Sequence, residues 1–346
     1  CAVMGTVSDR LNRLSESQTL AMTRKSRELT AQGVDVINLS IGEPDFDTPE
    51  VIKKAAKKAI DDNITHYSPV PGFPELREAI SKKFQRDNNL DYTSNQIVVS
   101  TGAKQSIANV VLSLVNPGDE VLLPAPFWVS YVEMVKIAEG IPVIISSSIE
   151  NDFKISAEKL KNAITDKTKL IIFSSPCNPT GTVYTKDELR EIAQVVAEKN
   201  DVFIIADEIY EHIIYEGKHV SIAEFDFINE RVITVNGVSK GFAMTGWRIG
   251  YIGAPEWITK ACIKIQGQFT SGASTISQKA AEAAIKLDPK STVEMCQIFR
   301  KRRDLLLNLL KEIPGITTNT PSGAFYVFPE VSSYFGKEFE GKEIKS

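Results

Sequence analysis

The stretch KLIIFSSPCNPTGTVYTKDELREIAQVVAEKNDVFIIADE, residues 169–208, decides the fold. It begins and ends with continuous apolar runs, at 169–175 and 202–208, and residues 186–199 between them have a helical pattern. Such short, continuous apolar runs are typical of strands buried on both faces. A strand, a helix and a second strand in this order predict an α/β fold with a largely parallel sheet covered by helices.

The same alternation extends on both sides of this stretch. Helical patterns occur at 103–115 and 156–164. Further strand patterns, short and rich in apolar and β-branched residues, occur at 96–100, 120–124, 142–146, 231–236 and 248–253. One α/β unit with a largely parallel sheet therefore accounts for the middle of the chain.

The two ends of the chain have a different pattern. Residues 17–32 and 290–312 are predicted helices, and strand patterns follow at 316–319 and 324–328. We therefore predict two domains: a large one at 49–287, and a small α+β one built from both ends, 1–48 and 288–346.

Composition and charge exclude some classes of partner. The 346 residues are 42% hydrophobic and 24% charged, which is typical of a globular protein with one or two cores. Lys and Arg total 40 and Asp and Glu total 44, so the net charge is −4. This balance gives no electrostatic reason to bind nucleic acid or an anionic membrane. We interpret the basic run RKRR, at 300–303, as a solvated helix face.

The cysteines and the apolar runs indicate a cytoplasmic protein. Cys1, Cys177, Cys262 and Cys296 match no zinc or redox spacing, and they are too few for a disulfide framework, so we expect reduced thiols and no metal site. No apolar run approaches the roughly 20 residues of a membrane span. The first residues also lack the charged-then-apolar pattern of a signal peptide.

Lys240 is the first candidate for chemistry. It follows the predicted strand at 231–236 and lies between Gly237 and Gly241, which permit a tight turn and the close approach of a ligand. A lysine in a dry pocket loses its proton readily and attacks a carbonyl to form an imine. Arg248, at the head of the next predicted strand, suits a phosphate, although an internal salt bridge explains it equally well.

Phosphate binding is also predicted at the start of the helix after residues 96–100. Gly102, Ala103 and Lys104 open this helix, and the free N–H groups of a helix start attract anions. The sequence contains neither the Gly-rich dinucleotide motif after a strand nor the P-loop motif. The usual sites for dinucleotides and nucleoside triphosphates are therefore missing.

Asp207 ends a buried strand, where α/β folds place their ligands. Paired with a protonated ring nitrogen, its carboxylate would keep the ring electron-poor; the alternative is a cap for the residues after it. Tyr210 is a candidate hydrogen-bond donor or an ordinary packed aromatic. The turn SSPCNPTG, 174–181, presents Asn178, or simply connects two elements. Trp128 is either a platform for a flat ring or a core residue.

Taken together and in this order, these segments closely resemble the class I and II aminotransferases, which are fold-type I pyridoxal phosphate (PLP) enzymes. The resemblance covers nearly the whole chain from about residue 17 and is greatest to the bacterial aspartate aminotransferase branch. It implies a three-layer large domain with a mostly parallel seven-stranded sheet. It is carried by SIGEPDFDTP, HYSPVPGFPELREAI, TGAKQSI, PGDEVLLPAPFWVSY, SSPCNPTG, ADEIYEHIIYEGKHVSI, NGVSKGFAMTGWRIGY and PSGAFYVF.

The resemblance implies a role for each candidate. Lys240 would form the Schiff base with PLP and then move a proton between the substrate Cα and the cofactor. Asp207 would pair with the ring nitrogen, Asn178 and Tyr210 would hydrogen-bond the phenolic oxygen, and Trp128 would stack on the ring. The residues around the phosphate would be Gly102, Ala103, Lys104, Ser239 and Arg248.

The resemblance also implies a partner subunit and a substrate site. Tyr67 would reach the phosphate of the neighbouring subunit, so a homodimer is expected. Gly42, Trp128 and Asn178 would lie against the substrate, and the Asn178–Pro179 bond would be cis. The implied activity is ping-pong amino transfer from an L-amino acid, with aspartate favoured, to 2-oxoglutarate.

The substrate is the least determined part of this prediction. Ser17 and Thr19 resemble polar residues that line the pocket for the distal carboxylate, but they suit equally an N-cap and first-turn residue. The family's Arg for the α-carboxylate lies beyond the position of Ser346, and no residue before Ser346 fits its motif. We therefore expect this polypeptide to bind PLP but to transaminate slowly.

Several alternatives stay open from the sequence. The enzyme could act on aromatic, alanine-like or other amino acids, because the cofactor motifs do not fix the side-chain pocket. A PLP-dependent β-lyase of the same fold would release pyruvate and ammonia instead. A PLP-binding regulatory module is a third interpretation, although the sequence offers no helix-turn-helix and no basic patch. A cofactor-free α/β binding protein would show no imine absorbance.

Overall fold

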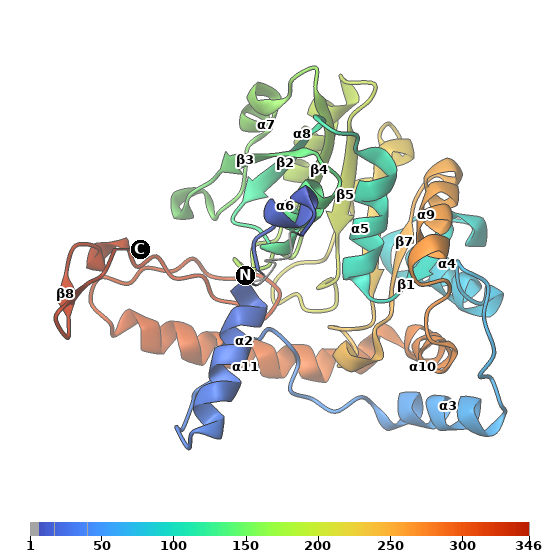
Figure 1. Ribbon diagram of the computed structural model, residues 1–346, viewed down its shortest axis with the longest axis horizontal. Helices are drawn as coiled ribbons and strands as arrows, with labels where there is room; N and C mark the ends of the chain where they lie inside the picture. The colour runs from blue at the N-terminus through green and yellow to red at the C-terminus, as the bar shows by residue number, and fades with distance from the viewer. Residues whose placement is uncertain (1–6, 17, 40, 346) are drawn as a thin grey trace, which may run out of the picture.

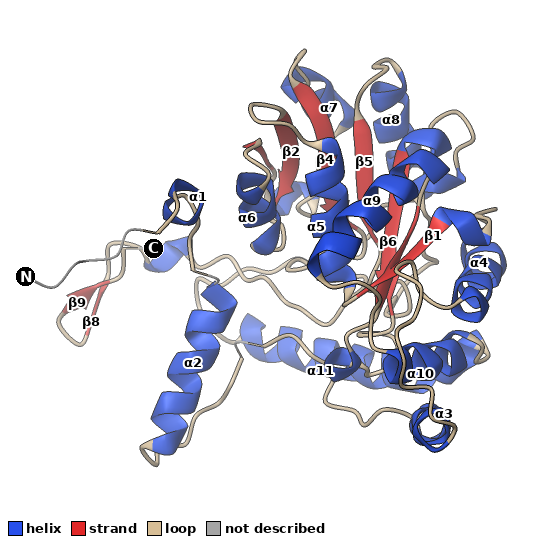
Figure 2. Ribbon diagram, turned by 45° about the vertical axis from the view of Figure 1, so that its right-hand side comes forward, coloured by secondary structure: helices blue, strands red, loops and turns tan. Residues whose placement is uncertain are grey.

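The computed structural model describes residues 7–16, 18–39 and 41–345 of the chain. Its centre is one seven-stranded sheet in the order β1-β7-β6-β5-β4-β2-β3 (Figures 1 and 2). The strands are β1 (Ile97–Ser100), β2 (Glu120–Ala125), β3 (Ile141–Ser146), β4 (Thr168–Ser174), β5 (Phe203–Asp207), β6 (Val232–Gly237) and β7 (Gly250–Gly253). Only β7 is antiparallel to its neighbours, which confirms the predicted, mostly parallel sheet.

Helices cover both faces of the sheet because the strands are apolar on both faces. Successive strand residues point to opposite faces, so Ile204 and Ile205 belong to two different cores. One core contains residues of α3 (Glu50–Asp61), α4 (Pro74–Asn88), α7 (Ala157–Ala163), α8 (Lys186–Ala197) and α10 (Thr275–Ile285). The other contains residues of α5 (Ala103–Leu114), α6 (Ser130–Ile137) and α9 (Glu256–Phe269).

The two ends of the chain lie outside this sheet, with α11 (Val293–Lys311) running below it (Figure 1). The N-terminal part contains α1 (Asp9–Asn12) and α2 (Gln18–Ala31), and the C-terminal part contains the short hairpin β8 (Glu338–Phe339) and β9 (Lys342–Glu343). The division into domains at 49–287, 1–48 and 288–346 stays a prediction.

The predicted strands at 316–319 and 324–328 are wrong. In the described part of the chain these segments take part in no ladder, and the isolated bridges nearby are Thr317–Glu330 and Ile214–Gly323. A strand needs consecutive backbone pairs with a neighbour. Thr317 forms one isolated bridge in the first segment, and no described residue of 324–328 forms a bridge, so the β-rich composition does not produce a sheet.

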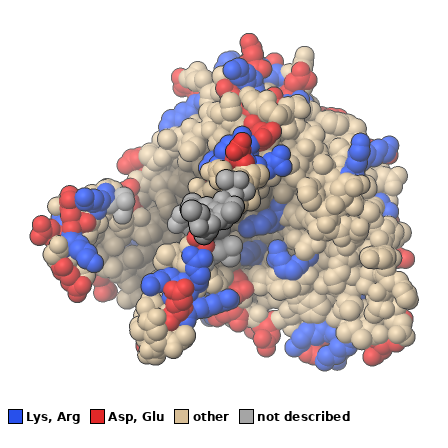
Figure 3. All heavy atoms as spheres, in the orientation of Figure 1, with Lys and Arg blue, Asp and Glu red and all other residues tan. Residues whose placement is uncertain are grey.

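The basic run in α11 differs from its prediction at one residue. Arg300, Lys301 and Arg302 are exposed, as expected for a solvated face. Arg303 is buried, because its guanidinium donates to the Pro321 carbonyl at 2.8 Å and pairs with Asp304. Figure 3 shows basic and acidic side chains interspersed over this face of the molecule.

Cys177, Cys262 and Cys296 are free thiols, and Cys1 lies outside the described residues. Among the described helices, none is long and apolar enough to cross a bilayer. The cytoplasmic location stays a prediction.

Candidate active site

The topology of the sheet brings the candidate residues to the side at which its parallel strands end. Six parallel strands end there, and the antiparallel β7 begins there, so side chains far apart in the sequence meet. Asp207 ends β5, Lys240 follows β6 by three residues, and Arg248 precedes β7 by two. They line a cavity of about 1060 Å³, together with Gly42, Ala103, Lys104, Trp128, Asn178, Tyr210 and Ser239.

Lys240 places its amine inside this cavity. Nζ donates a hydrogen bond of 2.6 Å to the Gly42 carbonyl and lies 5.9 Å from the ring centroid of Tyr210 and 5.6 Å from that of Phe325. Burial lowers the pKa of Lys240 to about 8, because the surroundings disfavour its charged form. A substantial fraction of this amine is therefore neutral and nucleophilic near neutral pH.

Asp207 is a buried carboxylate held by two donors. The Tyr131 hydroxyl donates to Oδ2 at 2.7 Å, and the Ile209 backbone N–H donates to Oδ1 at 3.3 Å. Burial raises the pKa of Asp207 to about 6, although both hydrogen bonds act in the opposite direction. In the described chain no α-helix follows Asp207 directly, so it is not a helix cap; residues 209–212 form turns.

A short chain of polar groups faces Lys240. The amide of Asn178 donates to the Tyr210 hydroxyl at 3.5 Å, and the hydroxyls of Tyr210 and Tyr326 are 2.6 Å apart. The Asn178–Pro179 bond is cis, as the resemblance implied. Tyr326 packs so closely on Gly42 that a Cβ at Gly42 would collide with its ring. Burial and Tyr326 raise the pKa of Tyr210, so this phenol stays protonated at neutral pH.

The phosphate candidates meet where α5 begins. Gly102 has φ +82, and a Cβ there would collide with the Arg248 guanidinium. Gly250 lies against the backbone of Gly102 and Ala103, where no larger residue fits. Ser239 is buried and lines the same cavity. The helix N-terminus and the guanidinium thus form one anion-binding pole.

The prediction that Arg248 begins the strand at 248–253 is wrong. It lies before β7 in the left-handed region, with φ 56, and its side chain is exposed. Its Nη1 donates to the Thr245 carbonyl at 2.9 Å, and it has no carboxylate partner among the described residues. The salt-bridge explanation therefore loses its support, and the guanidinium remains available to an anion.

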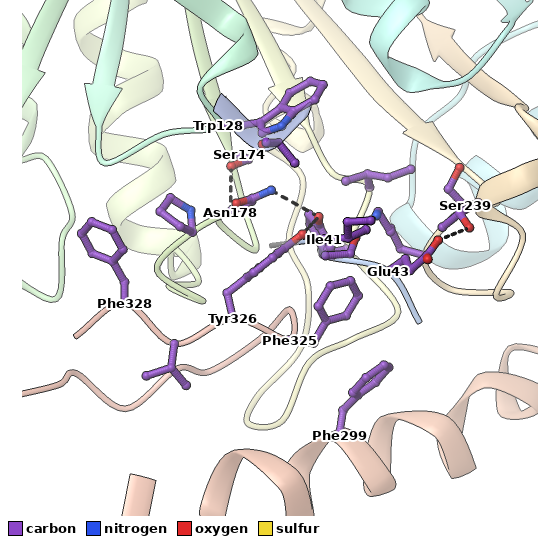
Figure 4. Close-up of a pocket in the computed structure, with 18 of the residues that line it drawn as sticks. Ile41, Glu43, Trp128, Ser174, Asn178, Ser239, Phe299, Phe325, Tyr326 and Phe328 are labelled. Carbon is purple, nitrogen blue, oxygen red and sulfur yellow. Dashed lines mark hydrogen bonds between the residues drawn. The ribbon is translucent and has the colours of Figure 1, made fainter. Parts of the chain in front are cut away.

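Trp128 lies on the wall of the cavity and is at the same time partly buried against the core that contains α5, α6 and α9. Its ring lies 4.9 Å from Lys104 Nζ and edge-on to Tyr131. Figure 4 shows Trp128 and Asn178 on one side of the cavity, and Tyr326, Phe325 and Phe299 on the other. The space between these walls suits a flat ring and its substituents.

The three remaining residues predicted for the partner and substrate sites are Tyr67, Thr19 and Ser17. Tyr67 lies outside the cavity and is fully exposed, so it serves no site within its own chain. Thr19 is in the described first turn of α2 and lines the cavity. Ser17 lies outside the described residues, so the two explanations offered for it stay open.

Tyr131 and Tyr326 are the residues that the sequence did not single out. Both lie in segments that carry the family resemblance, PGDEVLLPAPFWVSY and PSGAFYVF. Tyr131 follows the carboxyl end of β2, which is a usable signal, since ligands gather at that edge. No sequence signal links Tyr326 to Tyr210, which is 116 residues away.

The comparison with known families decides the identification. A family model described as aminotransferase class I and II matches residues 34–343. The chain belongs to this family.

Individual aminotransferases resemble the chain over almost its whole length. The bifunctional aspartate aminotransferase and glutamate/aspartate-prephenate aminotransferase of Petunia hybrida is 49% identical over 339 residues, which cover 97% of this chain and 71% of that protein. The aspartate/prephenate aminotransferase of Cereibacter sphaeroides is 45% identical, with 98% of this chain and 85% of that protein covered. The crystal structure of the aspartate aminotransferase from Rhizobium meliloti has a TM-score of 0.95 at 41% identity, covering 99% of this chain and 86% of that one.

Class I and II aminotransferases depend on PLP, and the cavity of this aminotransferase fits that cofactor. Lys240 offers an amine of lowered pKa for the aldehyde, and Asp207 offers a buried carboxylate for the ring nitrogen. The pole formed by Gly102 and Arg248 matches a phosphate in charge and in donors. When bound, PLP supplies an electrophilic aldehyde and an electron-withdrawing ring.

Replacing Tyr131 by Phe should weaken cofactor binding at mildly acidic pH. The change removes a donor to the Asp207 carboxylate, so the pKa of Asp207 rises further. A hydrogen bond to a charged group contributes about 1.5–3 kcal/mol, which corresponds to roughly one to two pH units. We expect the pH below which PLP affinity declines to move upward by that amount. Titration of the apoprotein with PLP between pH 5 and 8 measures it.

Tyr184→Phe is the matched control for this experiment, because Tyr184 is equally buried but its hydroxyl bonds the Ile155 N–H. That variant should leave the pH dependence of PLP binding unchanged. If Tyr131→Phe also leaves it unchanged, the Tyr131 hydroxyl does not stabilise the ionised carboxylate.

Proposed function

We propose that this aminotransferase transfers the amino group of aspartate to a 2-oxo acid, with 2-oxoglutarate as the favoured acceptor. The observation that carries the proposal is the Lys240 amine, held at 2.6 Å by the Gly42 carbonyl inside a cavity that also contains Asp207 and Arg248. Relatives that are 45–49% identical are named aspartate or aspartate/prephenate aminotransferases, which supports the choice of aspartate.

Lys240 performs the proton transfers in this proposal. Its neutral amine would hold the aldehyde that PLP supplies, and that aldehyde would later take up the substrate amine. In the same cavity this amine would accept the proton of the substrate Cα as general base and return it as general acid. Because its pKa is about 8, the amine both accepts and returns a proton near neutral pH.

The remaining residues of the cavity orient the cofactor and exclude water. Asp207 would hold the protonated ring nitrogen of PLP, and the hydrogen bonds from Tyr131 and the Ile209 N–H keep its carboxylate in place. Asn178 and Tyr210 would donate to the phenolic oxygen of PLP, and Trp128 would cover one face of its ring. Phe325 and Tyr326 line the opposite wall and exclude water from the reacting atoms.

Replacing Arg248 by Ala should weaken PLP binding by roughly 10- to 100-fold, since a hydrogen bond to a charged group contributes about 1.5–3 kcal/mol. Arg248→Lys keeps the charge but not the planar fork, so its affinity should fall between the two. Fluorescence titration of the apoprotein with PLP gives these constants. Equal affinities for all three proteins would exclude Arg248 from the phosphate site.

The cations that face the cavity favour anionic ligands, whether the cofactor phosphate or a substrate carboxylate. Lys104 is exposed to the cavity, and both burial and the charge of Arg248 lower its pKa. Thr19 adds a hydroxyl on the same lining. The cations suit an anionic substrate, but the lining does not distinguish aspartate from other dicarboxylates.

A second substrate is supported by one further observation. The wall opposite Trp128 is apolar and aromatic, with Phe299, Phe325 and Phe328 lining it. Relatives named aspartate/prephenate aminotransferases suggest prephenate as an alternative 2-oxo acid for such a wall. Comparison of kcat/KM for 2-oxoglutarate and prephenate, with aspartate as donor, separates the two acceptors.

A visible spectrum of the purified holoprotein tests the proposed function. We expect a band that changes with pH and that shifts to the aminated-cofactor band when aspartate is added. Release of oxaloacetate, without pyruvate and ammonia, distinguishes amino transfer from β-lyase chemistry. A protein with no cofactor band, or one that aspartate leaves unchanged, would contradict the proposal.

We also propose a homodimer. Its support is the fully exposed ring of Tyr67 and the exposure of Ile37 and Leu39, at 86% and 90%. Ile37 and Leu39 are two residues apart in the chain, and contiguous exposed apolar surface of this kind marks a protein interface. Light scattering at micromolar concentration should give twice the mass of the chain, and a single-chain mass would contradict it.

A further inference from the structure

The turn that carries Asp207 and Tyr210 has a second, buried side. In the segment Asp207–His212 the side chains of Asp207 and Tyr210 face the cavity, whereas Glu208, Glu211 and His212 are not part of its lining. Glu208 and Glu211 are nevertheless buried, with side chains 3% and 4% exposed. Buried carboxylates are costly unless they are paired, so each of them needs a cationic partner.

Each of the two carboxylates has a buried cationic partner. Lys83 Nζ forms an ion pair with Glu211 Oε1, and its side chain is 2% exposed. His219 Nε2 lies 3.0 Å from Glu208 Oε2, an ion-pair distance, although the angle is outside hydrogen-bond geometry. The rear network, as we name it, consists of Lys83, Glu208, Glu211 and His219.

Two neutral groups complete the surroundings of the rear network. Asn88 accepts from Lys83 Nζ at 2.6 Å and donates to Glu211 Oε2 at 2.7 Å, which ties α4 to the turn. His212 Nε2 lies 3.3 Å from Glu211 Oε1, and burial lowers the pKa of this imidazole, so it is neutral. Its ring packs on Gly241, where a Cβ would collide with it, and Gly241 follows Lys240 directly.

The charges of the rear network balance when His219 is protonated. Burial alone would lower the pKa of His219, but the neighbouring Glu208 carboxylate outweighs burial and raises it. Burial would likewise raise the pKa of Glu211, but the Lys83 ammonium holds it well below its usual range. Two carboxylates, one ammonium and one imidazolium then sum to zero.

A metal ion is the competing explanation. Glu208, Glu211 and His219 each offer a ligand atom, and these atoms lie within 4.8 Å of one another. A divalent ion with neutral His219 would leave the rear network with one net positive charge, because the Lys83 ammonium is already in contact with Glu211. A proton on His219 leaves no net buried charge, and burial strongly favours that state.

The rear network holds the turn from behind at several points. Lys83 and Asn88 come from α4, and His219 comes from the loop before residue 222. Glu208 also donates its backbone N–H to the Val235 carbonyl of β6, and Glu211 donates its own to the Glu208 carbonyl. Successive residues of this turn belong to the cavity and to the rear network. A displacement of Glu208 or Glu211 therefore also moves Asp207 and Tyr210.

We propose that the rear network positions the turn that carries Asp207 and Tyr210, and that its members are positioning residues for amino transfer. This inference rests on the proposed function. A positioning role explains why the ionisable residues of the rear network are buried next to the cavity without lining it.

The test is Lys83→Met in the full chain reconstituted with PLP. Loss of the ammonium leaves the Glu211 carboxylate unpaired, so the turn shifts. We expect the apparent pKa of the pH-dependent visible band to move by at least about half a unit. We also expect kcat with aspartate to fall about 10-fold while KM changes less than about 2-fold. Lys83→Arg, which keeps the charge, should recover most of the kcat.

Two further variants keep the result interpretable. Lys154→Met removes a partly buried ion pair outside the cavity lining, in which Lys154 is 16% exposed and 3.0 Å from Glu188, and it should change neither the band nor kcat. If Lys83→Met does not fold, the double variant Lys83→Met/Glu211→Gln leaves no unpaired charge and should fold. It should still show the shifted band and the lower kcat, because the ionic attachment of α4 to the turn is lost.

Three results would overturn the inference while leaving the proposed function intact. One is a folded Lys83→Met or double variant with the unsubstituted band pKa and kcat. A second is an equal change in Lys154→Met. The third is stoichiometric zinc or manganese that survives dialysis against a chelator and is lost in His219→Gln. Failure of the proposed function is distinct, because the unsubstituted protein would then show no band at all.

Discussion

Lys240→Ala protein should lose both its pH-dependent visible band and its amino transfer. Among the described residues, the lysines that line the cavity are Lys240 and Lys104, and the Lys104 amine lies over the ring of Trp128. Positioned general acid–base catalysis alone contributes roughly 10²- to 10⁴-fold, and loss of the covalent attachment adds to that. We expect no measurable turnover with aspartate, although PLP should still bind through its phosphate and ring contacts.

The matched control is Lys279→Ala. Lys279 pairs with Glu282 in α10, outside the cavity, and its removal should leave both band and turnover unchanged. Addition of a small primary amine to Lys240→Ala should restore part of the turnover, because the cavity then holds a replacement base. A Lys240→Ala protein that keeps its band and turnover would show that another amine performs the chemistry.

Asp207→Asn should have the second-largest effect on catalysis. The amide still accepts a hydrogen bond from Tyr131, so the geometry is preserved, but it carries no charge to keep the ring nitrogen protonated. Removal of one electrostatic stabiliser from a catalytic site costs roughly 10²- to 10³-fold in kcat. We expect that loss in kcat with aspartate, together with weaker PLP binding, from steady-state kinetics and titration.

The same substitution should stabilise the protein without cofactor. Burial raises the pKa of Asp207 from 3.8 to about 6, so folding favours the protonated acid and the ionised form costs about 3 kcal/mol above pH 6. The penalty is absent below about pH 4, where the acid is protonated in both states. The Asp207→Asn variant avoids the penalty at every pH, because its amide carries no charge.

Thermal unfolding of the apoproteins measures this effect. The stability advantage of Asp207→Asn should grow as the pH rises through the interval from about 4 to 6 and stay constant above it. An advantage that is independent of pH, or that shrinks as pH rises, would show that burial does not raise the pKa of Asp207.

The sheet and the positions of most candidate residues could be predicted from the sequence because both depend on local patterns. Apolar runs such as 202–208 form strands wherever helices cover both faces, and Asp207 lies at the end of such a run. The residues that follow or precede the other strands then reach the same edge through the parallel topology. Lys240, Asn178 and Gly102 are examples of this rule.

Other features could not be predicted because they depend on distant neighbours. The segments 316–319 and 324–328 have strand patterns, but no neighbour lies along them for consecutive pairs in the part of the chain that the structure describes. Arg248 begins an apolar run, yet it precedes the strand in a left-handed conformation and lies open to the cavity. The contact of Tyr326 with Tyr210 and that of Lys83 with Glu211 each join separate parts of the fold.

Borohydride reduction of the holoprotein, followed by peptide mapping, tests the central claim most directly. Reduction makes the bond between PLP and its lysine permanent, so the labelled peptide identifies the residue. The expected product is a single labelled peptide containing Lys240, absent after Lys240→Ala. Label on another lysine, such as Lys104, or no label at all, would contradict the account.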